Sequence, residues 1–161
     1  MELAPSFGPV NAHAEIDVRA TDREVWSVIA DIAAWPTWNP AVRHAVFTAD
    51  LEVGARFRFS REFGWMRGTL VEVDAPRTLA WSGRVLTLGQ RQIWRIAPRG
   101  DECRVTTDAS MHGLAARLFR RRLSRRLQGE LDALVRLLKL EAETRSIEAI
   151  EAAARRSAEH G

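Results

Sequence analysis

Residues 113–143 read GLAARLFRRRLSRRLQGELDALVRLLKLEAE and have the period of an amphipathic helix. Leucines at positions 123, 127, 131, 134 and 138 recur every three or four residues and form one apolar stripe. The pattern predicts one long helix that packs its leucine face against another element. Residues 144–161 are rich in Ala, Glu and Arg, and they either extend this helix or fray.

Upstream of this helix the chain predicts short strands separated by turns. Residues 12–20 alternate between apolar and charged side chains, which is the period of a half-buried strand. Thr21 and Glu24 then form a capping-box pattern that opens a helix, and the prolines at 36 and 40 limit the next helical turn. Six further strands are predicted at residues 42–49, 54–62, 66–74, 78–86, 89–97 and 102–110.

This order of elements predicts an α+β fold. Closely spaced strands favour an antiparallel meander, and a seven-stranded sheet must cover its apolar face with the long helix. If the sheet curves around the helix, a pocket remains between them unless side chains fill it. We therefore expect a ligand-binding domain at residues 12–143, a flexible leader at 1–11 and a charged tail, helical or frayed, at 144–161.

Five motifs together resemble the START-like polyketide cyclase/dehydrase superfamily (SRPBCC), which has the helix-grip fold. They are VWSVIAD at residues 25–31, WPTWNPAV at 35–42, GARF at 54–57, VEVDAPRTLAW at 71–81 and GDECRVT at 100–106. The resemblance covers about residues 12–140 and implies a curved seven-stranded sheet around a long C-terminal helix, with a cavity between them. Members of the superfamily include lipid carriers, hormone receptors and polyketide cyclases, so the fold alone does not settle the function.

Composition narrows the chemistry further. The net charge is +3, and Lys139 is the one lysine in the sequence, so a Schiff-base mechanism is disfavoured and anion recognition falls to arginine. Cys103 stands alone, which excludes an intrachain disulfide and favours a reducing compartment. The sequence shows neither a signal peptide nor an apolar run long enough to cross a membrane. We expect a cytoplasmic protein.

Aromatic side chains on the predicted strands supply the candidate binding site. Strand alternation places Phe57 and Phe59 on one face, and an aromatic wall suits a flat or apolar ligand. The alternative is that these side chains fill a solid core. Trp38 and Trp65 lie beside Pro or Gly in predicted loops and are expected at the cavity mouth. The residues predicted to bind the ligand are Trp38, Phe57, Phe59, Trp65, Trp81, Trp94, Thr107, Arg120, Leu123 and Leu127.

Arg120 falls on the same helical stripe as Leu123 and Leu127. An arginine on an apolar stripe either extends out at the helix end or meets an anion. That anion is a protein carboxylate, such as Glu62 or Asp108, or an acidic group of a ligand.

The remaining arginines between residues 117 and 126 face away from the leucine stripe. They form a solvated surface or, through Arg117, Arg121 and Arg125, a weak contact with an anionic membrane. Nucleic-acid binding is disfavoured because Phe119 is the one aromatic residue among them.

Candidates for catalysis are few. His44 and His112 could each transfer a proton if they faced the cavity. The sequence has no Cys/His cluster at metal spacing, no phosphate-binding glycine loop and no serine elbow, so neither a metal nor a cofactor is expected.

Three functions follow from this reading, and the first is favoured. The chain binds a small hydrophobic molecule such as a lipid, a quinone or a polyketide-like compound. Alternatively, it is a cyclase or dehydratase that uses the same cavity, or an interaction protein that uses the arginine-rich helix face. We expect a monomer or a homodimer.

Overall fold

The structure, a computed structural model, describes residues 8–161. Residues 1–7 of the predicted leader lie outside this range. The elements in chain order are β1 (Val10–Val18), α1 (Asp22–Ala30), the 3-10 helix η1 (Ile32–Ala34), α2 (Trp35–Trp38), β2 (His44–Val46), β3 (Arg56–Arg61), β4 (Gly64–Asp74), β5 (Thr78–Val85), β6 (Leu88–Arg99), β7 (Glu102–His112), α3 (Leu114–Leu118) and α4 (Arg120–Glu159).

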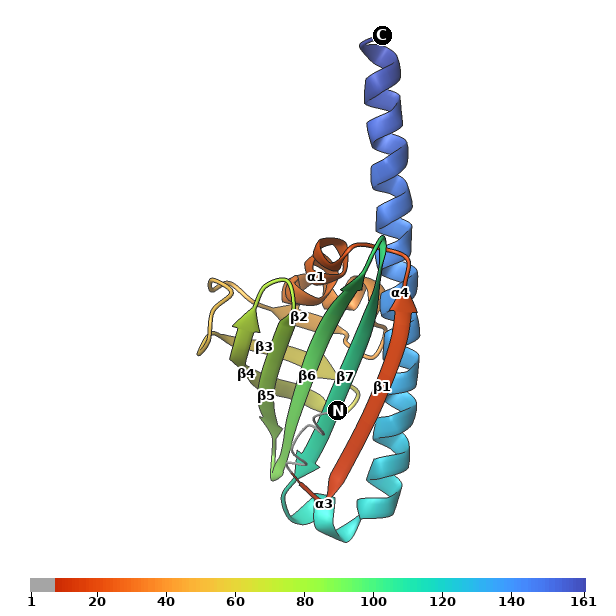
Figure 1. Cartoon of the computed structure of the whole chain (residues 1–161). Coiled ribbons are helices and arrows are strands. Elements are labelled where there is room, and N and C mark those ends of the chain that lie inside the picture. Colours follow the sequence, from red (N-terminus) through yellow and green to blue (C-terminus); the bar gives the residue numbers. More distant parts are fainter. Residues whose placement is uncertain (1–7) are drawn as a thin grey trace.

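The strands form a single antiparallel sheet of seven strands in the order β1-β7-β6-β5-β4-β3-β2. The first strand therefore pairs with the last, and β1 and β2 are the two edges. Helix α4 runs along the sheet beside β1, while α1 lies near one end of the sheet and α3 at the other (Figure 1). The predicted helix-grip fold is confirmed.

Alternation along the strands builds the buried face of the sheet. Phe57 and Phe59 on β3 are buried, as are Trp81 on β5 and Trp94 on β6. The leucine stripe of α4 packs on the same core, and Leu127 is almost completely buried. The apolar face predicted from strand alternation and the apolar face predicted from the helical period therefore pack against each other in the core.

The predicted capping box opens α1. The Glu24 backbone N–H donates to Thr21 Oγ1 at 3.2 Å, and the Thr21 N–H donates to Glu24 Oε2 at 2.9 Å. These reciprocal bonds fix the point at which the chain leaves β1 and turns over the end of the sheet.

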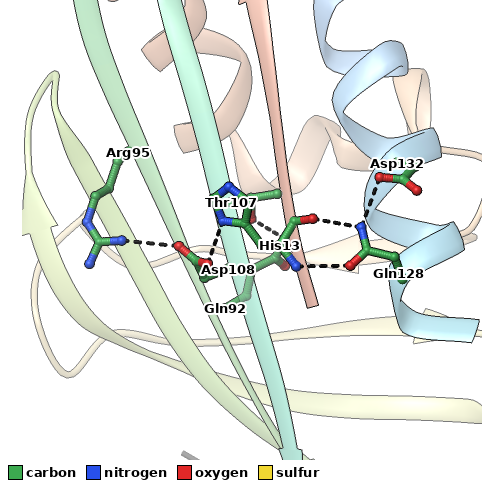
Figure 2. A network of polar contacts seen from close by, with 7 residues as sticks. All are labelled: His13, Gln92, Arg95, Thr107, Asp108, Gln128 and Asp132. Carbon is green, nitrogen blue, oxygen red and sulfur yellow. Dashed lines mark hydrogen bonds and ion pairs between the residues drawn. The ribbon is translucent and has the colours of Figure 1, made fainter. Parts of the chain in front are cut away.

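Helix α4 is tied to the edge strand β1 by side-chain hydrogen bonds to its backbone. Gln128 Oε1 accepts from the His13 N–H at 3.2 Å, and Gln128 Nε2 donates to the His13 carbonyl oxygen at 2.7 Å (Figure 2). Gln128 Nε2 also donates to Asp132 at 3.0 Å, and the His13 ring contacts Asp108, which is paired with Arg95. The amide of Gln128 thus bonds to β1 as a neighbouring strand would.

A second tie lies farther along the same helix. Lys139 Nζ donates to the Asp17 carbonyl oxygen at 2.9 Å, and the Arg19 N–H donates to Glu143 Oε1 at 2.9 Å. Burial opposes ionisation of Glu143, but the hydrogen bonds from Lys139 and the Arg19 N–H outweigh it and lower the pKa of that carboxyl. Its contribution to stability is therefore present near neutral pH and is lost as the pH falls through this lowered pKa.

We expect Gln128→Ala to lower the free energy of unfolding by about 1 kcal/mol, since it removes two hydrogen bonds to a partly hydrated edge. Urea denaturation of the purified variant measures this loss. Arg136→Ala, an exposed position on the same helix, is the matched control and should change stability little. Equal stability of the two variants would show that Gln128 does not hold α4 on β1.

Each strand differs from its predicted range by one or more residues at one end or both, and two of these differences have a clear structural reason. β1 begins at Val10 rather than residue 12, because Val10 already pairs with Met111 on β7. β2 was expected over residues 42–49 but spans His44–Val46, and its pairing with β3 ends at Val46 opposite Arg58. The next residue, Phe47, leaves the edge and packs its ring edge-on against Phe57, with centroids 6.5 Å apart.

The predicted single helix over residues 113–143 is divided and extended. The backbone leaves helical geometry at Phe119 (φ −112°, ψ 28°), so α3 and α4 are separate helices. Helix α4 then continues to Glu159, which is the helical alternative for the tail, and its last turns project beyond the sheet (Figure 1). Within residues 8–161 no helix has the length and apolar character needed to cross a bilayer.

Candidate functional site: a divided cavity between the sheet and helix α4

An inner cavity of about 190 Å³ lies between the sheet, helix α2 and helix α4. The sheet contributes aromatic side chains from β3, β5 and β6, and α4 contributes four leucines. Helix α2 and the segment that follows it cover the remaining side. The principal lining residues are Trp35, Trp38, Val42, Phe59, Trp81, Trp94, Leu127, Leu131, Leu134 and Leu137.

The aromatic wall of this cavity is held by edge-to-face contacts. The ring centroid of Trp81 lies 5.4 Å from that of Phe59 and 5.8 Å from that of Phe57, at interplanar angles of 84° and 80°. Trp35 meets Phe59 edge-on at 5.8 Å, and its Nε1 donates to the Ile29 carbonyl oxygen at 3.0 Å. The rings are thus fixed by packing and present a preformed apolar surface.

Gly68 makes this wall possible on the sheet side. Gly68 pairs with Phe57 across β3 and β4, and a side chain at position 68 would collide with the Phe57 ring. The ring therefore lies directly on the backbone of β4.

An end cavity, also of about 190 Å³, lies next to the inner cavity toward α3. Its apolar lining comes from β4 to β7, the β3–β4 turn and the first turns of α4. These residues are Phe63, Met66, Val85, Leu88, Met111 and Leu123.

An ion pair stands between the two cavities. Arg61 Nη2 on β3 lies 2.8 Å from Glu130 Oε2 on α4, and both side chains are partly buried. Arg61 and Glu130 line both cavities, as do Gln90 and Ala41. The two cavities therefore adjoin one another, and this charged bridge between the sheet and the helix lies at their common boundary.

Three polar atoms of the inner cavity's lining residues are buried without a hydrogen-bond partner among residues 8–161. They are Nε1 of Trp38, Nε1 of Trp81 and Oε1 of Gln90. All three side chains are at least nine-tenths buried. A buried donor or acceptor without a partner costs about 1–3 kcal/mol. The other polar residues that line this cavity are Asn39, Arg61, Gln92 and Glu130.

Five of the predicted ligand-binding residues line the inner cavity and a sixth, Leu123, lines the end cavity. The five are Trp38, Phe59, Trp81, Trp94 and Leu127. Strand alternation had indicated Phe59, Trp81 and Trp94, the Trp-Pro motif had indicated Trp38, and the helical stripe had indicated Leu127.

The other four predicted residues lie elsewhere. Phe57 is buried in the aromatic cluster and borders a shallow surface groove beside β2 to β4. Thr107 is buried and accepts a hydrogen bond from Gln92 Nε2 at 3.0 Å (Figure 2). Trp65 is half-exposed, and its ring stacks with His44.

Arg120 is exposed and lines neither cavity, so the expected pairing with a cavity ligand is corrected. Its helical phase does match that of Leu127. Helical phase does not predict burial here, because Arg120 is the first residue of α4 and lies one turn before the part of the stripe that packs on the sheet.

The two catalytic candidates also lie outside both linings. His44 and His112 are exposed, and His44 Nδ1 lies 3.2 Å from Ser60 Oγ. Burial raises the pKa of the Cys103 thiol to about 11, and the nearby carboxylates of Asp22 and Asp17 add to this shift. The thiol is therefore neutral at physiological pH and is a core side chain. No three His, Cys, Asp or Glu residues of the described chain gather as metal ligands would.

The polar part of the site was missed by the sequence analysis, although a signal for it existed. Arg61 continues the alternation of Phe57 and Phe59, which places it on the buried face. Glu130 lies three residues after Leu127 and therefore on the leucine stripe of α4. A charged residue on each of two facing apolar surfaces is the pattern of a partly buried ion pair.

Comparison with known proteins agrees with this geometry. A family model described as polyketide cyclase / dehydrase and lipid transport matches residues 9–139. The chain belongs to this family. Search of curated protein sequences found no match.

Solved structures share the fold at low sequence identity. A hypothetical protein from Helicobacter pylori superposes with a TM-score of 0.75 at 16% identity, covering 86% of this chain and 90% of its own. A START superfamily protein from Mycobacterium smegmatis gives a TM-score of 0.64 at 15% identity, covering 86% and 98%. Norcoclaurine synthase from Thalictrum flavum, solved with a transition-state analogue, gives 0.64 at 15% identity, covering 82% and 92%. These similarities show that the chain has the START-like fold. They do not identify the ligand of this member of the family.

Proposed function

We propose that this chain binds one small, largely apolar molecule that carries a hydroxyl or carbonyl oxygen, in the inner cavity between the sheet and α4. The observation that carries the proposal is the pair of buried indole N–H groups, on Trp38 and Trp81, without a partner in residues 8–161. An oxygen of the ligand would accept a hydrogen bond from one of them. A hydroxyl group would also donate to Gln90 Oε1.

The size of the cavity limits the ligand. An engineered cavity of about 150 Å³ holds a benzene molecule, so the inner cavity of about 190 Å³ suits a compound of about one or two rings. A longer molecule, such as a lipid chain or an extended polyketide, would have to pass the Arg61–Glu130 bridge into the end cavity. Binding of such a molecule requires this ion pair to open.

The distribution of charge favours binding over catalysis. Arg61 and Glu130 are the only charged side chains among the described residues lining the inner cavity, and they neutralise one another. The cyclase or dehydratase alternative relied on His44 or His112 for proton transfer, and both are exposed. Norcoclaurine synthase has the same fold, so an enzymatic role for this chain needs a proton-transferring group other than these histidines.

Titration calorimetry with 2-naphthol and naphthalene tests the proposal, because the two ligands differ in one hydroxyl group. We expect the protein to bind 2-naphthol at least about fivefold more tightly, since the hydroxyl satisfies donors that naphthalene leaves unpaired. The double variant Trp38→Phe/Trp81→Phe should bind naphthalene as before and lose this preference. Trp26→Phe is the control, because Trp26 lines neither cavity.

Two results would contradict the proposal. Equal affinities of the unaltered protein for the two ligands would mean that the indole N–H groups do not recognise oxygen. Absence of binding of either ligand would mean that the cavity is not a site for molecules of this size.

A further inference from the structure

One end of the domain carries large apolar side chains on its surface. They come from the β3–β4 turn, the β5–β6 turn, and α3 with its junction to α4. We call this set the end patch, and it consists of Phe63, Leu86, Leu114, Leu118 and Phe119, whose exposed fractions run from 56% to 91%. Exposed apolar side chains gathered in this way mark an interaction surface.

Strand register brings these segments to the same end of the sheet. The β3–β4 turn follows the pair Arg61–Gly64, and the β5–β6 turn follows the pair Val85–Leu88. At the end of β7, a side chain on Gly113 would collide with the carbonyl oxygen of Thr87, so α3 begins directly against the β5–β6 turn. Figure 1 shows α3 and the β5–β6 turn at this end of the sheet, opposite α1 and the C-terminus.

The same end is strongly cationic. Residues 113–129 contain six arginines and no aspartate or glutamate. Arg126 pairs with Glu62 and Glu130, and its guanidinium lies over the Phe63 ring, 4.6 Å from the centroid. The other five form no ion pair with any residue of 8–161, and all are exposed: Arg117, Arg120, Arg121, Arg122 and Arg125.

Apolar and cationic groups are interleaved on this surface. Leu118 and Phe119 sit between Arg117 and Arg120 in the chain, at the break between α3 and α4. A bilayer with anionic headgroups can bind both kinds of side chain. Its phosphates accept hydrogen bonds from the guanidinium groups, and the apolar side chains insert at the boundary of the acyl chains. An acidic protein or nucleic acid would use the arginines and leave the leucines in water.

We propose that the end patch and the five arginines without an ion pair in residues 8–161 dock this protein on membranes that contain anionic phospholipid. The end cavity lies beneath the same surface, because Phe63 belongs to its lining as well as to the patch. Docking would therefore place this cavity at the bilayer. The inference does not depend on the proposed function, because docking requires no ligand in either cavity.

Vesicle co-sedimentation of the full chain tests the proposal, with phosphatidylcholine vesicles that either contain or lack phosphatidylglycerol. We expect a partition coefficient at least about tenfold higher on the anionic vesicles. The double variant Arg121→Gln/Arg125→Gln should lose about tenfold, and its matched control is Arg155→Gln/Arg156→Gln, at the far end of α4.

A second pair of variants tests the apolar part. Leu118→Ser/Phe119→Ser should lower binding to anionic vesicles several-fold, whereas Ile147→Ser/Ile150→Ser, also exposed on α4, should leave it unchanged. All four positions are at the surface, so the variants should fold as the parent does. Circular dichroism and thermal unfolding check this.

Three results would overturn the proposal. The first is absence of binding to anionic vesicles. The second is equal binding to vesicles with and without phosphatidylglycerol. The third is equal loss of binding in the end-patch variants and their matched controls, which would show that binding is not localised to this end of the domain.

Discussion

Trp81→Ala is expected to lower the free energy of unfolding by about 3–5 kcal/mol, the range for a buried Trp truncated to Ala. Trp81 is almost fully buried and is the ring that Phe57, Phe59 and Trp35 all contact, with centroids 5.8, 5.4 and 6.4 Å away. Truncation would remove the centre of this cluster and enlarge a cavity that already exists. Urea denaturation measures the loss.

Trp81→Phe separates the packing of this residue from its hydrogen-bonding role. A phenyl ring keeps most of the contacts, so the loss should stay below about 1.5 kcal/mol. Removing a buried N–H that has no partner within the described residues offsets part of that loss. If Trp81→Ala cost as little as Trp81→Phe, the aromatic cluster would not be the core that the structure shows.

Leu134→Trp is expected to weaken binding of 2-naphthol by about a hundredfold or more, because an indole at this position takes up the space of the ligand. Leu134 is half-buried on α4 and lines the inner cavity. Filling the cavity should leave the melting temperature unchanged or raise it, in contrast to the effect of Trp81→Ala.

Titration calorimetry and thermal unfolding of the same sample check both parts of this expectation. Arg136→Trp is the control, since Arg136 is exposed on the opposite side of the helix. Unchanged affinity in Leu134→Trp would place the ligand outside the inner cavity.

Much of the fold could be predicted because its signals are local. Alternation identified the strands, the Thr21–Glu24 box marked the start of α1, and the leucine period marked the helix that covers the sheet. The errors occurred where tertiary contacts determine the length of an element. β2 is short because Phe47 leaves the sheet edge to pack in the core, which no local pattern at residues 42–49 indicates.

The site was predictable in its apolar half only. Periodicity assigns a side chain to a face, and that sufficed for Trp81, Trp94 and Leu127. It does not say which side chain on a distant element will be opposite, so the contact between Arg61 and Glu130, 69 residues apart, was not found. Arg120 shows the opposite error. Its helical phase was assigned correctly, but the helix does not pack on the sheet at that position, so the phase did not predict a place in the cavity.

The surface at the α3–α4 junction had a partial signal. The run of arginines was evident in the sequence, and a weak contact of Arg117, Arg121 and Arg125 with an anionic membrane was the alternative to a solvated surface. Exposure of Leu118 and Phe119 beside them depends on the break at Phe119, which turns α3 away from the axis of α4. The sequence carries no proline or glycine at this break.

Native mass spectrometry of the gently purified protein, followed by denaturing extraction, tests the central claim most directly. The account predicts a bound apolar molecule that contains oxygen in the unaltered protein, and the ligand-free mass in Leu134→Trp prepared in parallel. The contradicting result is a ligand-free mass in the unaltered protein together with no uptake of 2-naphthol on titration, which would show that the space between the sheet and α4 is not a binding site.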